Sequence, residues 1–150
     1  MAESGADTEE LNVGLLLFLP YRAMENRIFA ALAQAGFDDF TLAQARVMQR
    51  IGPDGTRLTE LAEAAQVTKQ TASHLVDQLE RTGYVRRTPD PTDARARLVR
   101  LAERGTAAQP VAAAVVAEVE AGWRAHLGER RWRQLRAALT DLREITDPYR

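Results

Sequence analysis

The chain has 150 residues, 45% of them hydrophobic and 27% charged, and a formal net charge of -1 at pH 7. These values are ordinary for a globular domain with its own core, and they exclude a polycation, so any nucleic-acid surface must be a local patch. The absence of cysteine excludes disulfides, thiol redox sensing and cysteine-ligated metal sites. Because the chain has only two histidines, we expect neither a metal site nor a cofactor.

The N-terminal region predicts neither a membrane anchor nor a secretion signal. Its apolar run from Val13 to Leu19 is far shorter than the roughly 20 residues that span a bilayer, and no basic stretch precedes the run. Residues 1–10 contain four acidic side chains and no basic one. We therefore expect a disordered acidic tail at 1–10, no membrane partner and a cytoplasmic location.

A helical pattern covers residues 11 to about 35, and Gly36 is its expected end. Pro20 lies inside this pattern and predicts either a kink or the start of a new helix. Residues 15–19 are apolar on more than one side of the helix, which is more than one domain face requires. We therefore expect residues 11–36 to form an N-terminal dimerisation helix.

Two short helices follow in the predicted order. Thr41 is expected to cap the first, roughly residues 42–51, and a turn follows at residues 52–55. The inward-facing residues expected in this helix are Ala43, Val47 and Met48. Thr59 is expected to cap the second helix, about residues 60–65.

The stretch from Thr68 to Gly83 predicts an amphipathic helix with a polar side that faces DNA. One apolar stripe has three- and four-residue spacing and consists of Ala72, Leu75, Val76 and Leu79. The other face carries hydrogen-bonding side chains, namely Lys69, Gln70, Ser73, His74 and Gln78. Thr68 is the expected N-cap. Lys69 falls in the first turn, where the helix dipole disfavours a cation, which indicates an anion outside the protein.

The next segments predict a winged helix. Helices 60–65 and 68–83 are joined by two residues, which is the helix-turn-helix pattern without the usual glycine in its turn. The hydrophobic period then changes to two, and extended runs at 84–88 and 95–101 flank a tip rich in proline and aspartate. This pattern predicts a β-hairpin with a long loop. Basic side chains outnumber acidic ones by eight to five over residues 68–104, so the positive charge is concentrated here.

The C-terminal third predicts two more helices. Gly105 is expected to end the second strand, and helices are expected over residues 106–127 and 129–145. Both are strongly apolar, so we expect residues 105–150 to intertwine with a second copy of the chain. The predicted fold class is mainly α with a small β-hairpin wing. In it, a winged helix-turn-helix domain at 37–104 lies between N- and C-terminal dimerisation helices.

The segment RLTELAEAAQVTKQTASHLVDQLERTGYVRR, followed by PDPTDARARLVRLAERG, resembles the DNA-binding core of the multiple-antibiotic-resistance regulator (MarR) family. The flanking helices extend the resemblance over residues 11–145. The most specific part is the wing motif DPTDAR before ERG. The resemblance implies an obligate homodimer on a pseudo-palindromic operator in double-stranded DNA. It also implies a repressor that is released by a small aromatic or anionic effector.

The resemblance further implies a set of site residues. The groove-facing positions match Thr68, Lys69, Gln70, Thr71, Ser73 and His74. The wing-tip arginine matches Arg95, with Asp93 expected to hold it, and Arg87 completes the expected DNA-binding set. Lys69 and Thr71 would bind phosphates, whereas the side chains at 70, 73 and 74 would reach base edges. Two positions depart from the family pattern, because His74 replaces a common arginine and Ala94 a frequent second wing arginine.

Other functions remain as alternatives. His74 near Asp77 resembles a base with its orienting acid, but such an exposed helical pair is usually surface chemistry, and we expect no enzyme. A winged-helix module that binds proteins without reading DNA is the stronger rival, because the terminal helices are apolar. The residues that fit an effector pocket fit a plain core equally well, so ligand-binding residues stay unknown at this point; they are Tyr21, Met24, Met48 and Pro110.

Overall fold

The computed structural model describes residues 10–147, so the expected acidic tail lies outside the described residues except for its last residue. In chain order the elements are α1 Val13–Gln34, α2 Leu42–Gln49, β1 Thr56–Arg57, α3 Leu58–Ala64, α4 Lys69–Arg81, β2 Val85–Asp90, β3 Asp93–Leu101, α5 Glu103–Leu127 and α6 Glu129–Thr146. No helix in this part of the chain has the length and apolar character needed to cross a membrane.

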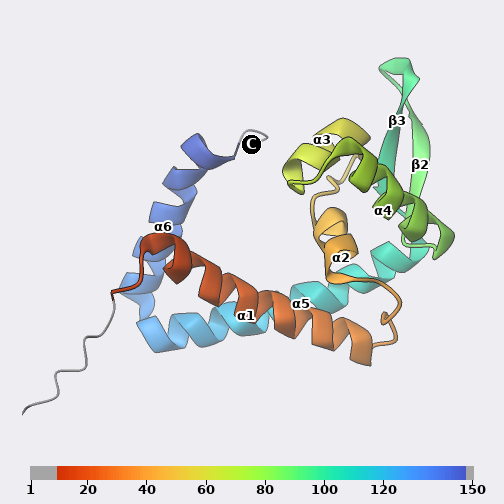
Figure 1. The fold of residues 1–150 in the computed structure, drawn as a ribbon. Coiled ribbons are helices and arrows are strands. Elements are labelled where there is room, and N and C mark those ends of the chain that lie inside the picture. Colours follow the sequence, from red (N-terminus) through yellow and green to blue (C-terminus); the bar gives the residue numbers. More distant parts are fainter. Residues whose placement is uncertain (1–9, 148–150) are drawn as a thin grey trace, which may run out of the picture.

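Two long helices and a compact lobe make up the arrangement. Helices α1 and α5 run side by side, and α2, α3, α4 and the sheet form the lobe at one end of this pair (Figure 1). Helix α6 turns away from the other end of α5 (Figure 1). The predicted fold class, a winged helix-turn-helix with flanking helices, is therefore confirmed.

Helix α1 is one continuous helix with Pro20 inside it, so no new helix begins there. Its N-cap is Asn12, whose Oδ1 accepts a hydrogen bond of 3.0 Å from the Leu15 amide. Beyond the C-terminal end, Gly36 adopts a left-handed φ of 95°, as expected for a helix stop.

Helix α2 begins with a reciprocal capping box. Gln44 N donates to Thr41 Oγ1 at 3.2 Å, and Thr41 N donates to Gln44 Oε1 at 2.8 Å. The prediction that Ala43 faces inward is wrong, because Ala43 is exposed and the buried residues are Gln44, Ala45 and Val47. Gln44 occupies the inward position because its side chain both accepts from the Thr41 amide and donates to Gln78 of α4.

A third strand, β1, was not expected from the sequence. Thr56 pairs with Val99 and Arg57 with Leu98, so the antiparallel sheet has the order β1-β3-β2. This pairing keeps the chain extended up to the start of α3. Helix α3 consequently begins at Leu58 without a side-chain cap, and the prediction that Thr59 caps it is wrong.

The turn between α3 and α4 explains the missing glycine. Gln66 itself adopts the left-handed conformation, with a φ of 57°. Its Nε2 donates to the Glu63 carbonyl oxygen at 2.8 Å, which helps to offset the cost of that conformation. Helix α4 then starts and ends close to its predicted limits, and Gly83 has a left-handed φ of 84° beyond it.

The wing is tighter than expected. Strands β2 and β3 pair as far as Asp90 opposite Asp93, which leaves only Pro91 and Thr92 at the tip. The prediction of a long loop is wrong because Asp90 Oδ1 accepts hydrogen bonds from the Thr92 amide at 2.8 Å and hydroxyl at 2.7 Å. A side chain that binds the backbone two residues ahead closes a turn.

Helix α5 begins three residues earlier than predicted. Gly105 lies in its first turn and is buried, so this residue does not end the strand. A Cβ at Gly105 would overlap the carbonyl oxygen of Tyr84, which shows that only glycine lets α5 pack so closely on the start of β2. Gly128, with a φ of 81°, separates α5 from α6.

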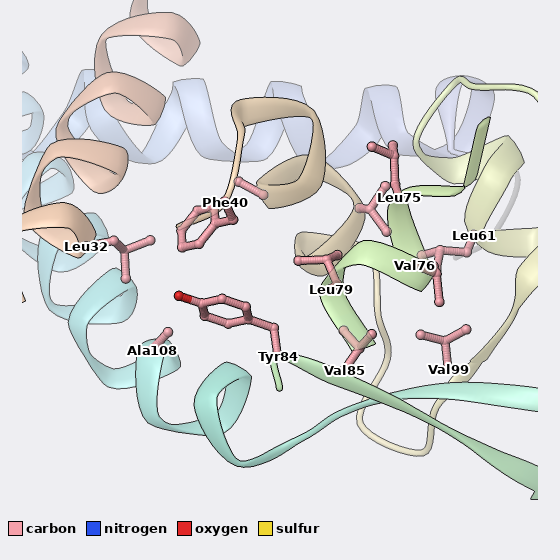
Figure 2. Packing of buried hydrophobic residues seen from close by; sticks show 12 residues of the cluster. Leu32, Phe40, Leu61, Leu75, Val76, Leu79, Tyr84, Val85, Val99 and Ala108 are labelled. Carbon is pink, nitrogen blue, oxygen red and sulfur yellow. The ribbon is translucent and has the colours of Figure 1, made fainter. Parts of the chain in front are cut away.

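The core of the lobe joins α4 to every neighbouring element (Figure 2). The predicted apolar stripe of α4 is buried, and Ala72, Val76 and Leu79 are all 0% exposed. Burying each larger aliphatic side chain of such a stripe contributes roughly 1.5–3 kcal/mol. The other side of α4 is therefore the side that faces solvent.

Candidate DNA-binding surface

The outer face of α4 presents the side chains predicted to contact DNA. Lys69, Gln70, Thr71 and His74 are exposed and Ser73 is partly buried. These residues share one helix whose opposite face is buried. The packing of that buried face therefore determines which side of α4 points to solvent. The helix can enter a groove wide enough for an α-helix, as the major groove of B-DNA is.

The N-terminus of α4 is capped as predicted. Thr68 Oγ1 accepts from the Thr71 amide at 3.0 Å and donates to Thr71 Oγ1 at 2.9 Å. Thr71 is exposed, so its hydroxyl can also reach an acceptor outside the protein. Thr68 acts structurally in this arrangement, because its own oxygen is engaged by the helix end.

Lys69 is exposed in the first turn of α4, which holds no acidic residue. Within residues 10–147 its ammonium forms no ion pair. Amides at a helix start and a cation beside them together make a favourable position for a phosphate.

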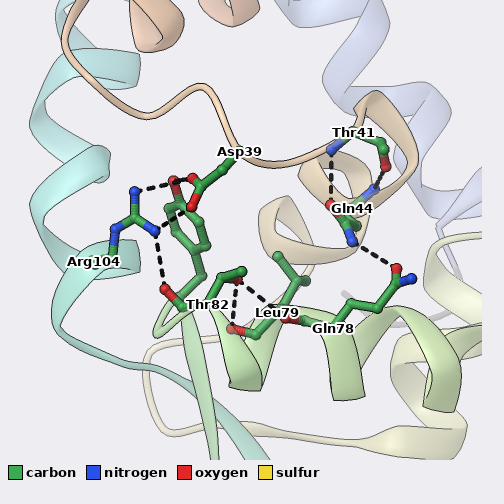
Figure 3. A network of polar contacts seen from close by, with 8 residues as sticks. Asp39, Thr41, Gln44, Gln78, Leu79, Thr82 and Arg104 are labelled. Atoms are coloured by element: carbon green, nitrogen blue, oxygen red, sulfur yellow. Dashed lines mark hydrogen bonds and ion pairs between the residues drawn. The ribbon is translucent and has the colours of Figure 1, made fainter.

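His74 is connected to the interior of the lobe by a chain of hydrogen bonds. Gln44 Nε2 donates to Gln78 Oε1 at 2.7 Å, and Gln78 Nε2 lies 3.2 Å from His74 Nε2 (Figure 3 shows the inner part of this chain). His74 therefore contacts Gln78 and not Asp77, the acid considered as its orienting partner.

Arg87 is not among the free cations of this surface. Its guanidinium pairs with Asp77 at 2.8 Å and Glu80 at 3.1 Å, and its side chain is only 19% exposed. The Arg87 amide also donates to Glu80 Oε2 at 3.0 Å. Arg87 thus ties β2 to the outer side of α4, and a phosphate would have to compete with two carboxylates for it.

The expected partnership at the wing tip involves the backbone. Asp93 Oδ1 accepts a 3.0 Å hydrogen bond from the Arg95 amide. The Arg95 side chain is exposed, and its guanidinium has no acidic partner in the described part of the chain. Asp93 therefore fixes the backbone that carries Arg95, while the guanidinium stays available.

An ion pair behind the tip was missed by the sequence reasoning. Arg57 of β1 donates a hydrogen bond to Asp90 Oδ2 through Nε at 2.8 Å, and its Nη2 lies 2.7 Å from the same oxygen in an ion pair. Hydrogen bonds from the Thr92 amide and hydroxyl, with the Arg57 guanidinium, lower the pKa of Asp90 to about 2. The DPTD turn was a visible signal for the Asp90 interaction, but its partner lies 33 residues away on a strand that was not predicted.

The start of α4 and the wing line one basic hollow. It is bordered by Arg57, Leu58, Thr59, Lys69, Arg87, Arg95, Ala96, Arg97 and Val99. Five of these nine residues are cationic, and within the part of the chain that the structure describes no acidic residue borders the hollow. The structure therefore brings Lys69 and Arg95 together, although 26 positions separate them in the sequence.

A second, apolar cavity of about 360 Å³ lies between α1, α2 and α5. Of the four residues left open between pocket and core, Tyr21, Met24 and Met48 border this cavity, whereas Pro110 does not. At one side is Glu25, which is 4% exposed and accepts hydrogen bonds from Arg46 at 2.9 and 3.0 Å and from the Tyr21 hydroxyl at 2.8 Å. The Arg46 hydrogen bonds lower the pKa of Glu25, so the carboxylate is charged and fully paired.

These features define a winged helix-turn-helix protein with long flanking helices. Residues 38–96 match the model of the MarR family. The lobe is therefore the DNA-binding domain of the MarR transcriptional regulators, a family whose members are not enzymes. Among curated proteins, none matches the chain significantly.

Solved structures share the fold over nearly the whole chain. The transcriptional regulator PA4135 has a TM-score of 0.69 at 25% identity and covers 91% of this chain and 98% of its own. A MarR family protein of Mycobacterium tuberculosis in complex with salicylic acid has a TM-score of 0.62 at 27% identity, and the match covers 89% of this chain and 98% of that protein. A mutant of S. aureus MepR bound to an oligodeoxyribonucleotide has a TM-score of 0.56 at 24% identity, and the match covers 92% of this chain and 100% of that protein.

Proposed function

We propose that this regulator binds a specific sequence in double-stranded DNA, as a homodimer on a pseudo-palindromic operator. One observation carries the proposal: Lys69 at the start of α4 and Arg95 of the wing border the same hollow, and neither forms an ion pair within residues 10–147. A two-fold dimer that places α4 in successive major grooves requires half-sites about 34 to 36 Å apart. Such a regulator would act in the cytoplasm.

Each side chain has a role that follows from its position. Lys69 and the Thr71 hydroxyl bind phosphates and fix the register of α4. Gln70, Ser73 and His74 reach base edges in the major groove. Arg95 enters the adjacent minor groove and reads its shape. Arg87 contributes by holding β2 against α4, with any phosphate contact secondary to its two ion pairs.

Dimerisation is proposed for the ends of the chain, within residues 11–36 and 105–150. Large apolar side chains are exposed there in a single protomer, and they are Leu11, Val13, Leu15, Leu16, Leu17, Phe18, Leu19, Tyr21, Leu135, Leu139, Leu142 and Ile145. A folded monomer rarely exposes so many large apolar residues in one region without a partner that covers them.

Repression relieved by a small molecule is the proposed mode of control. The apolar cavity lies where α1 and α5 meet the DNA-binding lobe, so a bound compound can alter the spacing of the two α4 helices in the dimer. The ligand must bind the DNA-incompetent spacing more tightly, since equal affinity shifts nothing. The apolar lining favours the aromatic part of a ligand, and an anionic group on that ligand would have to compete with Glu25 for Arg46.

The experiment for DNA binding is charge reversal. Lys69→Glu, His74→Glu and Arg95→Glu together should abolish binding to duplexes selected from a random pool by the unchanged protein. The dimer, measured by light scattering, should persist. Binding that survives the triple change would favour the alternative, a winged-helix module that recognises proteins without reading DNA.

The experiment for control by a ligand uses salicylate as the probe. Salicylate should raise the melting temperature and weaken binding to the selected duplex. Ala112→Phe, which fills the cavity from α5, should remove both effects. If the duplex is released equally well from this variant, the cavity is not the effector site.

A further inference from the structure

A chain of hydrogen bonds with a fixed direction runs from the backbone to His74. The Thr41 amide can only donate, so the Gln44 atom that lies 2.8 Å from it must be the oxygen. The Gln44 nitrogen then donates to Gln78 Oε1 at 2.7 Å. This leaves the Gln78 nitrogen, a donor, facing His74 Nε2 at 3.2 Å.

The direction of this chain sets the protonation of the imidazole. A donor at Gln78 requires His74 Nε2 to be an acceptor, so in the neutral ring the proton is on Nδ1. Gln44 is 7% exposed, and its place in the α2 capping box prevents the amide from turning over. In an unrestrained histidine both tautomers are populated, and here one of them is excluded.

The other side of the ring is open. His74 is exposed on the outer face of α4, and among residues 10–147 its Nδ1 has no hydrogen-bond partner. The ring therefore offers solvent a single N–H donor and no acceptor. This is the side of α4 assigned above to the major groove.

We propose that Gln44 and Gln78 are positioning residues that hold His74 as an Nδ1–H donor, which makes it select a base edge carrying an acceptor. This inference rests on the proposed DNA binding. In the major groove guanine presents only acceptors, at N7 and O6, whereas cytosine presents an amino donor. His74 should thus favour guanine over cytosine at its contact, roughly two- to tenfold for one hydrogen bond.

The first test reads the tautomer in the free protein, without DNA. Nitrogen NMR at about pH 8, above the ordinary range for histidine, distinguishes protonated from unprotonated ring nitrogens. His126→Gln assigns the signals, because the chain has only two histidines. The expected spectrum has the proton on His74 Nδ1. A proton on Nε2 would overturn the proposal.

The second test reverses the direction of the chain. In Gln78→Glu both side-chain oxygens accept, so the carboxylate still pairs with Gln44 but now requires the His74 proton to be on Nε2. Gln78→Met removes the donor and should give a mixture of tautomers. An unchanged melting temperature shows that a variant is folded. If the melting temperature falls, an unchanged far-UV circular dichroism spectrum at the temperature of the experiment shows the same. Gln134→Glu on α6 is the matched control and should leave the spectrum unchanged.

The third test selects duplexes from a random pool with the original protein and each Gln78 variant. At one position of the consensus, the preference for guanine over cytosine should be lost with Met and reversed with Glu. The added charge of Glu weakens all duplexes alike and does not alter this ratio. If the three proteins select the same base there, base selection by the tautomer is refuted while DNA binding stands. If the original protein enriches no duplex, the proposed function itself fails and the inference falls with it.

Discussion

The guanidinium carbon of Arg104 lies 4.3 Å from the centroid of the Tyr84 ring, and both side chains bind Asp39. Arg104 Nη1 donates to Asp39 Oδ2 at 2.6 Å and to the Thr82 carbonyl oxygen at 3.0 Å (Figure 3). Asp39 precedes α2, Tyr84 directly precedes β2 and Arg104 is in the first turn of α5. This cluster therefore joins the DNA-binding lobe to the long helices.

Arg104→Lys should lower the free energy of unfolding by about 1–2 kcal/mol, because an ammonium keeps the charge but loses the paired contacts and the stacking on Tyr84. Urea unfolding followed by circular dichroism measures the change. Arg130→Lys, on the exposed side of α6, is the matched control and should have almost no effect. Equal stability of the two variants would mean that the cluster does not join the lobe to α5.

Acid should remove the stabilisation that two paired carboxylates, Asp39 and Asp90, contribute to the fold. Hydrogen bonds from Arg104 and Tyr84 lower the pKa of Asp39 to about 2, and the pKa of Asp90 is also about 2. Both pKa values are below that of an aspartate in the unfolded chain, about 3.9. The stabilisation from the two ionised carboxylates is therefore fully present above about pH 4 and is lost as the pH falls toward 2. Asp90→Asn should be less stable at neutral pH and lose less stability on acidification. Asp54→Asn, in an exposed turn, is the control and should lose as much stability on acidification as the original protein.

Two glycines of α5 should respond in opposite directions to alanine. Gly105→Ala should cost at least about 2 kcal/mol, since the new Cβ overlaps the Tyr84 carbonyl oxygen. Gly122→Ala meets no atom within 4 Å and should stabilise the helix by about 0.5–1 kcal/mol. Melting temperatures of both variants test the pair. Similar shifts would contradict the close packing of α5 on the start of β2.

Arg95→Ala should weaken binding to the selected duplex and reduce the salt slope of the binding constant by about one. The reason is the loss of one cation that displaces counterions from the phosphates around the minor groove. Titrations over a range of salt concentrations measure the slope. Arg130→Ala removes the same charge far from the wing, and an identical slope for both variants would remove Arg95 from the DNA-binding set.

Leu139→Glu should dissociate the dimer at micromolar concentration, because the stripe of α6 that contains it is apolar and exposed in one protomer. Light scattering gives the mass directly. Ala137→Glu adds the same charge two residues away on the other side of α6 and should leave the dimer intact. A dimer that tolerates Leu139→Glu would exclude this stripe from the interface.

Most of the fold was predictable, because helices and hairpins depend on local patterns. The α4 stripe, the Thr68 cap and the Gly83 stop needed only residues within a few positions of each other. The errors occurred where distant segments meet. The start of α3 moved because β1 pairs with β3, and the Ala43 prediction failed because Gln44 turns inward.

The sequence by itself determined which side of α4 is polar, where the basic charge is concentrated and which family the chain resembles, since these follow from residue type and spacing. Tertiary structure alone decided which of those side chains are free. It engaged Arg87 with two acids, left Arg95 without an ion pair among the described residues, and placed Gln44 beside Gln78, 34 residues away. The physical reason is that such contacts depend on how the elements pack. Packing brings together residues that are far apart in the sequence, and local sequence patterns do not predict such pairs.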